Sequence, residues 1–287
     1  MTGKAIVYVG GHRTPCTMKI AVCGKGGVGK TFLAGSLAAH FASTGRPVIA
    51  IDADSSPNLA LTLGLTQEEA SRIQPVAENE ELIRVKTATD HPGVFRLSFS
   101  VEDIIAKYAV QTPSGAHLLV MGTIKAAGTG CTCPAHSVVR ALMRHLVVER
   151  NEVVILDMEA GIEHLGRGTA ARVDVLLAVS DANKKSLLTA ATICRLANEA
   201  GIPVAGIVAN RNATPKEEEI VRAFAEENGI VLLGSVPYDP AVREAGITGE
   251  PAVPGQSPAW NAVRELAGAL EKAKRPEDKS RQTGTTG

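Results

Sequence analysis

The stretch that decides the fold lies near the start of the chain, where Lys19-Ile20-Ala21-Val22-Cys23 runs into Gly24-Lys25-Gly26-Gly27-Val28-Gly29-Lys30-Thr31. The aliphatic run predicts a buried strand, and the glycine-rich turn after it opens onto a helical pattern. The turn matches G-x-x-x-x-G-K-[ST]. In this motif backbone N–H groups close around phosphate oxygens, the lysine reaches the β and γ phosphates, and the hydroxyl binds Mg²⁺. The sequence therefore predicts a strand, a phosphate loop and a helix that together bind a nucleotide.

The same loop also fits a second pattern, G-x-G-x-x-G, through Gly24, Gly26 and Gly29. With Asp52 at the end of the next strand to hold a ribose hydroxyl, this pattern is typical of dinucleotide-binding folds. A dinucleotide needs neither a lysine at a γ phosphate nor a hydroxyl for Mg²⁺ at the start of the helix. Lys30 and Thr31 therefore favour a nucleoside triphosphate over NAD.

Six more aliphatic runs predict buried strands, and helical stretches separate most of them. The runs are residues 48–51, 117–121, 153–156, 175–179, 204–208 and 230–236. Hydrophobic residues make up 45% of the chain and aromatic residues only 3%, so the core must consist mainly of Ala, Val, Ile and Leu. Buried parallel sheets with helical covers have this composition. We expect an α/β fold with a doubly wound, mainly parallel sheet and helices on both faces.

The 287 residues divide into one large core and two polar ends. We expect an ATPase domain over residues 18–271, an N-terminal extension over 1–17 and a disordered polar tail over 272–287. Residues 66–115 have the least regular pattern. They predict an insertion that flanks the nucleotide end of the sheet.

Charge, apolar runs and cysteines limit the partners. The 30 basic and 30 acidic residues give a net charge of zero, so nothing indicates a broad basic surface for nucleic acid or anionic membrane. No run reaches the length of a membrane-spanning helix, and residues 1–17 lack the pattern of a signal peptide. Five cysteines are too few to stabilise a chain of this length by disulfide bonds, and this favours a reducing compartment. We expect a cytoplasmic protein with neither a membrane nor a nucleic-acid partner.

Three carboxylates are placed where strands end. Asp52 and Asp54 follow the second predicted strand, and Asp157 ends the strand over residues 153–156. Parallel strands end at one edge of a sheet, where the ligands of open α/β folds bind. Beside a phosphate loop these carboxylates are expected to hold Mg²⁺ and to orient water, because phosphoryl transfer needs a metal and an oriented nucleophile. We assign Thr31, Asp52 and Asp157 to Mg²⁺.

The lysine inside the loop, Lys25, gives the sequence a resemblance to the deviant Walker A ATPases, the group of MinD, ParA and the nitrogenase iron protein. Their signature K-G-G-x-G-K-[ST] begins at this lysine. The resemblance implies an ATPase that forms a nucleotide-sandwich homodimer, with Lys25 acting across it. It also implies that Asp54 positions the attacking water and that residues 157–161 form the Walker B and switch II region. The implied catalytic residues are Lys25, Lys30 and Asp54.

The resemblance extends to the pocket for the base. Val208-Ala209-Asn210-Arg211 resembles a strand that ends in Asn-Lys and contacts adenine, and Pro237-Tyr238-Asp239 resembles a second element beside the base. Each segment taken alone fits a loop or a helix cap equally well. The implied nucleotide contacts are Gly26, Gly27, Val28, Gly29, Lys30, Thr31, Phe32, Asn210, Arg211, Pro237 and Tyr238.

Three positions depart from the pattern of these ATPases. Arg211 replaces the common lysine, and Ser55 stands where proline is frequent. Phe32 replaces a frequent hydroxyl residue, so we expect a weaker contact with the α phosphate while ATPase chemistry persists.

A pair of cysteines, Cys131 and Cys133, is separated by one residue. Two such thiols can chelate one soft or borderline metal, and a reducing compartment favours this over a disulfide. Tetrahedral Zn²⁺ or square-planar Ni²⁺ takes about four ligands, and this segment offers two thiolates and His136. A second chain would complete the set with its own cysteines. The alternative, two unrelated loop cysteines, stays open at this point.

A closer resemblance rests on Gly130-Cys131-Thr132-Cys133-Pro134-Ala135-His136 and on residues 157–169, which contain Glu-His-Leu-Gly-Arg-Gly-Thr. Both resemble the CooC family of nickel-insertion ATPases that mature carbon monoxide dehydrogenase, and the resemblance spans about residues 18–271. It implies a homodimer, driven by ATP and Mg²⁺, that binds Ni²⁺ (or Zn²⁺ in its place) between paired Cys131 and Cys133. The implied partner is apo carbon monoxide dehydrogenase or another nickel enzyme.

Two other functions compete with this one. A positioning or partition ATPase like MinD or ParA needs a C-terminal amphipathic membrane helix or a basic DNA-binding surface, whereas residues 260–273 predict a packing helix. An iron–sulfur carrier or reductase ATPase holds its cluster through cysteines in two separated segments, which one C-x-C does not supply. Metal analysis and an absorption spectrum of the anaerobic protein would discriminate between them.

Overall fold

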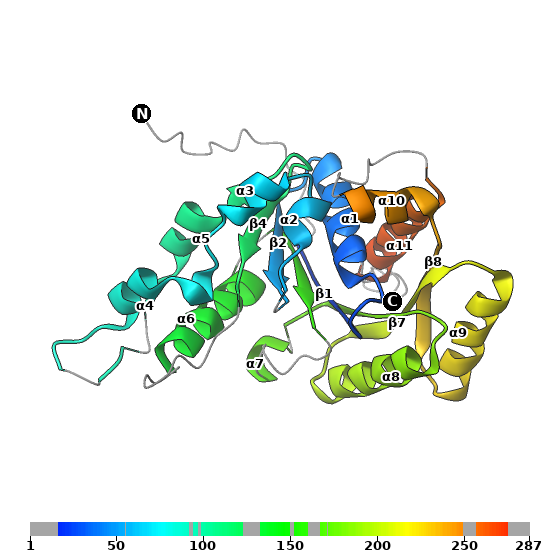
Figure 1. Cartoon of the computed structure of the whole chain (residues 1–287). Coiled ribbons are helices and arrows are strands. Elements are labelled where there is room, and N and C mark those ends of the chain that lie inside the picture. Colours follow the sequence, from blue (N-terminus) through cyan, green and yellow to red (C-terminus); the bar gives the residue numbers. More distant parts are fainter. Residues whose placement is uncertain are drawn as a thin grey trace, which may run out of the picture.

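The computed structural model of the chain describes residues 17–54, 56–91, 94–96, 99–122, 133–149, 152–159, 167–170, 172–248 and 257–274. Within these residues eight strands form one sheet in the order β3-β4-β2-β5-β1-β6-β7-β8 (Figure 1). Every neighbouring pair is parallel except β3 with β4. The chain has the doubly wound α/β fold that the sequence predicts.

All seven predicted runs are strands. They are β1 (Met18–Gly24), β2 (Val48–Ala53), β4 (His117–Val120), β5 (Val153–Met158), β6 (Val175–Ser180), β7 (Val204–Asn212) and β8 (Val231–Pro237). Of these, β2, β5 and β7 continue far enough past the aliphatic run that Asp52, Asp157 and Asn210 lie inside them. The short antiparallel edge strand β3 (Val110–Gln111) was not predicted.

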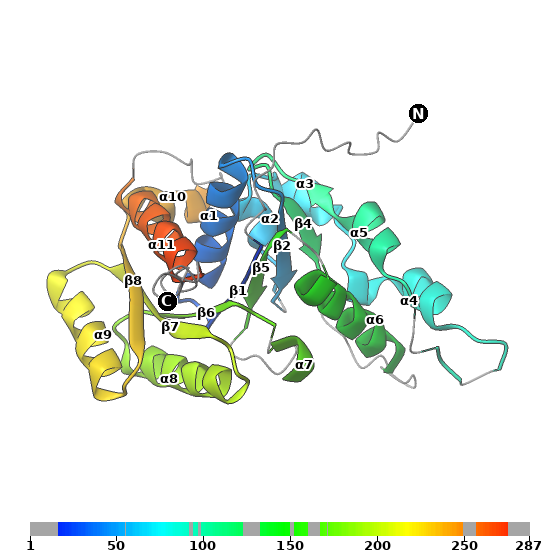
Figure 2. The same ribbon diagram turned by 180° about the vertical axis from the view of Figure 1, so that it is seen from behind.

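Helices cover both faces of the sheet (Figures 1 and 2). One face carries α1 (Lys30–Ser43), α2 (Leu59–Thr62) and α11 (Pro258–Lys274), and the other carries α6 (Cys133–Arg144), α8 (Lys184–Glu199) and α9 (Pro215–Glu227). Strand side chains alternate between the two faces. In β1, Ile20 and Val22 pack in the core under α1 and α11, whereas Ala21 and Cys23 pack in the core under α6 and α8.

The segment predicted as an insertion lies beyond the β4 edge of the sheet (Figure 1). It contains α3 (Gln67–Ser71), η1 (Val76–Glu78), α4 (Glu80–Thr87) and α5 (Glu102–Tyr108). Both η1 and α4 contact α6. The backbone N–H of Ala77 in η1 donates to the carbonyl of Met121, just past β4, at 2.9 Å. The insertion is therefore tied to the carboxyl end of β4 and to the helix that begins at Cys133. A π-helical turn, η2 (His145–Glu149), continues α6.

The last helix, α11, packs as the sequence predicts. Val263, Leu266 and Leu270 are buried in the core that α11 shares with α1. The helix ends at Lys274, one residue after the predicted span of residues 260–273, and so includes residues 272–274 of the segment predicted as a polar tail. Residues 1–16 and 275–287 lie outside the described residues.

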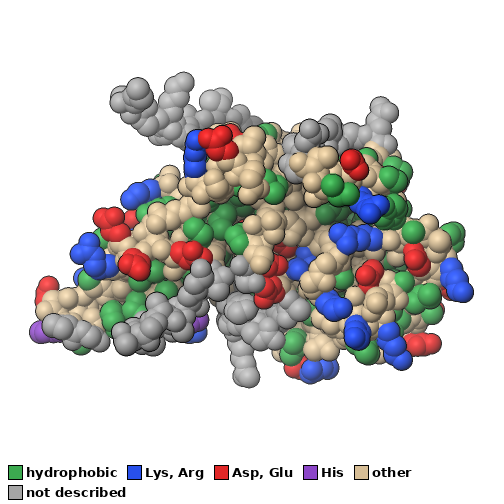
Figure 3. Space-filling view, viewed as in Figure 1, with side chains coloured by type: hydrophobic (Ala, Val, Ile, Leu, Met, Phe, Trp, Pro, Cys, Tyr) green, Lys and Arg blue, Asp and Glu red, His purple; other side chains and the backbone are tan. Residues whose placement is uncertain are grey.

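Charges are mixed on the face of the molecule that Figure 3 shows. On the face in Figure 3, basic and acidic side chains alternate over most elements, in keeping with the equal numbers of the two kinds. In the part of the chain that the structure describes, no helix has the length and apolarity needed to cross a bilayer.

Candidate nucleotide site

The phosphate loop joins β1 to α1 at the carboxyl edge of the sheet. Gly29 is the N-cap of α1 and has φ 92°, and a Cβ there would lie 2.3 Å from the Nδ2 atom of Asn210. Only glycine fits this position. No side chain caps α1 and no acidic residue stands in its first turn, whereas Asn183 caps α8 and Thr214 caps α9. The first N–H groups of α1 are therefore open to an anion.

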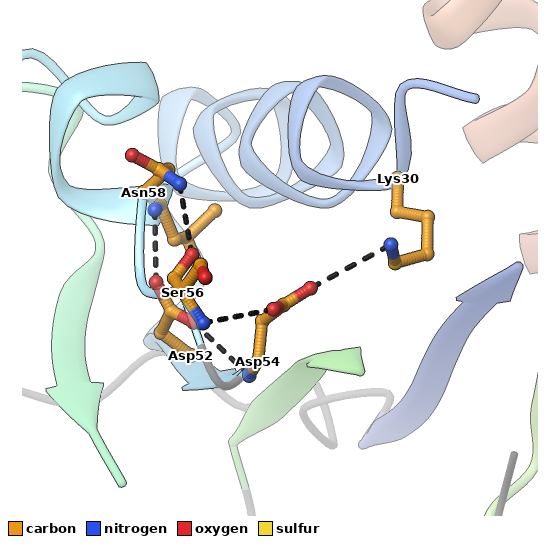
Figure 4. Close-up of polar contacts among 6 residues, drawn as sticks. Lys30, Asp52, Asp54, Ser56 and Asn58 are labelled. Atoms are coloured by element: carbon orange, nitrogen blue, oxygen red, sulfur yellow. Dashed lines mark hydrogen bonds and ion pairs between the residues drawn. The ribbon is translucent and has the colours of Figure 1, made fainter. Parts of the chain in front are cut away.

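Lys30 and Asp54 face each other across this edge (Figure 4). The ammonium of Lys30, whose side chain is 7% exposed, lies 3.6 Å from Oδ2 of Asp54. Oδ1 of Asp54 accepts the backbone N–H of Ser56 at 3.0 Å. Two of the three side chains assigned to catalysis, Lys30 and Asp54, thus form an ion pair in this structure.

Asp52 holds the turn that carries Asp54. Its Oδ2 accepts the backbone N–H of Leu59 at 2.9 Å, and its Oδ1 accepts the N–H of Asp54 at 3.3 Å (Figure 4). Burial raises the pKa of Asp52, and the two backbone N–H groups partly offset this rise. Asp52 therefore serves as a cap for the turn before α2, besides its predicted role at Mg²⁺.

Asp157 has a different environment, although it lies beside Asp52 in the register of β5 and β2. It is fully buried, and neither carboxylate oxygen has a hydrogen-bond partner among the described residues. Burial raises its pKa to about 7; Asp52 and Asp54 add to the rise, and the nearby Thr31 hydroxyl and Lys30 ammonium oppose it. A buried carboxylate without donors suits a cation, so Asp157 and Thr31 fit the predicted role of holding Mg²⁺, which would neutralise phosphate charge.

Within the described residues the three carboxylates do not form one group that could hold a metal ion, and Asp54 pairs with Lys30 instead. The sequence could not separate their roles. The distinction depends on which backbone N–H groups the turn after β2 presents.

A cavity of about 410 Å³ lies beside the loop. Its lining includes Asn210, Arg211, Pro237 and Tyr238, which the resemblance places beside the base, and Phe32, which was expected near the α phosphate. Part of the wall was not predicted: α10 (Pro240–Thr248) lines the cavity through Val242, Arg243, Gly246 and Ile247. The spacing of four residues between Val242 and Gly246, and between Arg243 and Ile247, was the available signal for a helical wall.

The end of β7 reaches back to the phosphate loop. Nδ2 of the buried Asn210 donates to the carbonyl of Val28 at 2.7 Å, and Nη1 of Arg211 donates to the carbonyl of Gly27. Nδ2 of Asn210 keeps a second hydrogen, and Oδ1 has no hydrogen-bond partner among the described residues. These contacts join segments about 180 residues apart in the sequence.

The structure describes the remaining predicted residues only in part. Lys25 is half-buried and has no ion-pair partner among the described residues. Cys133 begins α6, but its side chain is not described, and His136 is exposed one turn further along that helix. Cys131, Ser55 and residues 160–166 lie outside the described residues.

Comparison with known proteins defines the class. Residues 19–252 match the CobQ/CobB/MinD/ParA nucleotide-binding domain, and the chain belongs to this family of P-loop ATPases. It is 43% identical over 238 residues to an uncharacterized ATP-binding protein of Methanocaldococcus jannaschii, covering 82% of this chain and 90% of that protein. It is also 43% identical over 234 residues to the carbon monoxide dehydrogenase accessory protein CooC of Rhodospirillum rubrum, covering 81% of this chain and 88% of that protein.

A solved structure of this class confirms the fold. MinD from Aquifex aeolicus, in its complex with MinC, matches with a TM-score of 0.62 and 21% sequence identity over 90% of this chain and 97% of that chain.

Proposed function

We propose that this chain is an ATP-hydrolysing metallochaperone that dimerises with nucleotide, binds Ni²⁺ through paired Cys131 and Cys133, and assists nickel insertion into carbon monoxide dehydrogenase or another nickel enzyme. The observation that carries the proposal is the 43% identity to the CooC accessory protein over most of both chains. The C-x-C at Cys131 and Cys133 supports it, because two thiolates from each of two chains meet the ligand count of Ni²⁺ or Zn²⁺.

The base pocket supports ATP as the nucleotide. Oδ1 of Asn210 can accept from the 6-amino group of adenine. Asp239, which also lines the cavity, accepts the backbone N–H groups of Ala241 at 2.9 Å and Ala259 at 3.3 Å. Two acceptor positions of its carboxylate are therefore already used.

The ion pair between Lys30 and Asp54 suggests how binding prepares hydrolysis. Phosphate oxygens attract the Lys30 ammonium more strongly than one carboxylate does, since they carry more charge. Lys30 then exchanges Asp54 for the phosphates, and Asp54 is released to orient water. Lys25 of the partner chain would add a second ammonium at the same phosphates.

The path of the chain supports a link between nucleotide and metal. The backbone N–H of Met121 donates to the carbonyl of Asp52 at 2.8 Å, and the chain then runs through residues 123–132, which include Cys131, into α6. If nucleotide binding moves the turn after Asp52, this bond would move Met121 and therefore the start of the segment that leads to the cysteine pair.

The test is a Ni²⁺ titration of the anaerobic protein, followed by sedimentation and metal analysis. We expect one metal per two chains, with a metal-induced dimer that Cys131→Ala and Cys133→Ala each lose while ATP binding is kept. Cys194→Ala is the matched control, because this buried thiol, whose pKa burial raises to about 11, sits in α8 away from the predicted site. One tight metal per monomer that survives loss of both cysteines would refute the site.

A further inference from the structure

Arg211 has an unusual backbone position. The register of β7 against β8 shifts between Asn210 and Asn212, so Arg211 drops out of the ladder. Its φ is 62°, and no other non-glycine residue in the described part of the chain has a positive φ. A bulge in a strand changes the direction in which a side chain points. A positive φ at a residue other than glycine is strained, and it persists only where neighbouring contacts stabilise it. Here the side chain is aimed at the carbonyl of Gly27 in the phosphate loop.

The two contacts from the end of β7 fall on consecutive peptide groups of the loop. In a trans peptide the C=O and the following N–H point in opposite directions. Arg211 holds the carbonyl of Gly27, so the N–H of Val28 points away from the guanidinium; its bond to the Lys25 carbonyl is long, at 3.5 Å. Asn210 likewise holds the carbonyl of Val28, so the N–H of Gly29 points away from the Asn210 side chain.

We propose that Arg211 is a positioning residue which, together with Asn210, orients the loop peptides so that the N–H groups of Val28 and Gly29 face the phosphates. This goes beyond the metallochaperone proposal and does not depend on it. It assigns to Arg211 an action through the loop, whereas its place in the cavity wall alone would make it a contact for the base. A loop held in its binding geometry loses less entropy when the anion binds.

The two roles differ in which ligand they affect. A residue that orients the loop changes the affinity for every ligand bearing the phosphates, including inorganic tripolyphosphate. A base contact changes the affinity for ATP and leaves tripolyphosphate untouched. Arg243 is the matched control, because it lines the same cavity and makes no hydrogen bond to the loop among the described residues.

The experiment measures ATP binding and tripolyphosphate binding by competition against a fluorescent nucleotide. For Arg211→Ala we expect both affinities to fall by about tenfold to a hundredfold, the cost of losing one hydrogen bond from a charged donor. Arg243→Ala should leave tripolyphosphate binding unchanged. Arg211→Lys should recover part of both affinities, because an ammonium can donate to the same carbonyl.

Two further readouts separate positioning from damage to the fold. Arg211→Gly relieves the positive φ, so its melting temperature should not fall, yet it should lose both affinities as Arg211→Ala does. The amide resonances of Val28 and Gly29 should move in Arg211→Ala and not in Arg243→Ala. Unchanged tripolyphosphate binding in Arg211→Ala or Arg211→Gly, or a loss confined to ATP, would overturn the proposal.

Discussion

Replacing Asp157 by asparagine should stabilise the protein in the absence of nucleotide and Mg²⁺. The structure buries this carboxylate fully and gives it no hydrogen-bond partner among the described residues. Its pKa is raised from 3.8 to about 7, so the folded state holds a proton that the unfolded chain releases between these values. Stability contributed by this group is therefore fully present below about pH 4 and is lost as the pH rises through 7.

The size of the effect follows from the shift. At pH 8 the ionised Asp157 costs about 4 kcal/mol, because each pKa unit is worth about 1.4 kcal/mol. Asparagine removes the charge but leaves a buried amide without partners, which costs roughly 1–3 kcal/mol. The net gain at pH 8 is therefore roughly 1–3 kcal/mol, and each kcal/mol raises the Tm of a chain of this size by about 2–4 °C.

The assay is thermal unfolding of the wild type, Asp157→Asn and Asp52→Asn from pH 5.5 to 8 in a chelator. Asp52→Asn is the control, since it is the same change on the adjacent strand. Its carboxylate accepts two backbone N–H groups, which one amide oxygen cannot replace, so we expect no gain in Tm. The Tm difference between Asp157→Asn and the wild type should grow with pH. An Asp157→Asn protein that is less stable than the wild type at pH 8, or a difference independent of pH, would refute the reasoning.

Other predictions concern catalysis and the loop. Lys30→Ala should lower phosphate release from ATP at least about a hundredfold, because it removes the ammonium at the developing charge; wild-type turnover would contradict this. Asp54→Ala should retain Mg·ATP and accumulate as a dimer on size-exclusion chromatography, and a dimer that still turns over normally would remove its assigned role. Lys25→Ala should bind nucleotide as a monomer and hydrolyse it poorly, and mixtures with Lys30→Ala should depart from the activity of two independent enzymes if Lys25 acts across the dimer. Gly29→Ala should lose ATP affinity by about tenfold or more, since its Cβ would meet Asn210 and its φ is strained; calorimetry showing normal binding would count against the tight approach.

The strands were predictable because short aliphatic runs between turn residues are typical of buried strands, and this chain has few aromatic residues to form its core in another way. Hydrophobicity does not mark where a strand stops, however, because backbone pairing continues after the side chains turn polar. Asp52, Asp157 and Asn210 therefore appeared to follow their strands and instead lie within them. The edge strand at Val110–Gln111 is too short to leave a pattern.

The site was predictable as a set of residues but not as a set of contacts. Parallel strands end at one edge, so the loop, the carboxylates and the base residues were expected to converge there. The bonds from Asn210 and Arg211 to the loop depend on a register shift between β7 and β8 that no local spacing encodes. The sequence also does not reveal that Asp54 and Lys30 pair, since that depends on how the turn after β2 folds onto Asp52.

Asp52 is the point at which the two halves of the proposed function meet. Its side chain holds the turn that carries Asp54, and its carbonyl accepts the N–H of Met121, from which the chain leads to the cysteine pair. A movement of the Asp54 backbone away from Lys30 would move this turn. The turn is hydrogen-bonded, through the carbonyl of Asp52, to Met121 just past the end of β4, the strand that precedes Cys131. Coupling between two sites is reciprocal. If nucleotide changes the affinity for Ni²⁺ through this connection, Ni²⁺ must change the affinity for nucleotide by the same factor, and both effects must weaken together when the turn is loosened at Asp52.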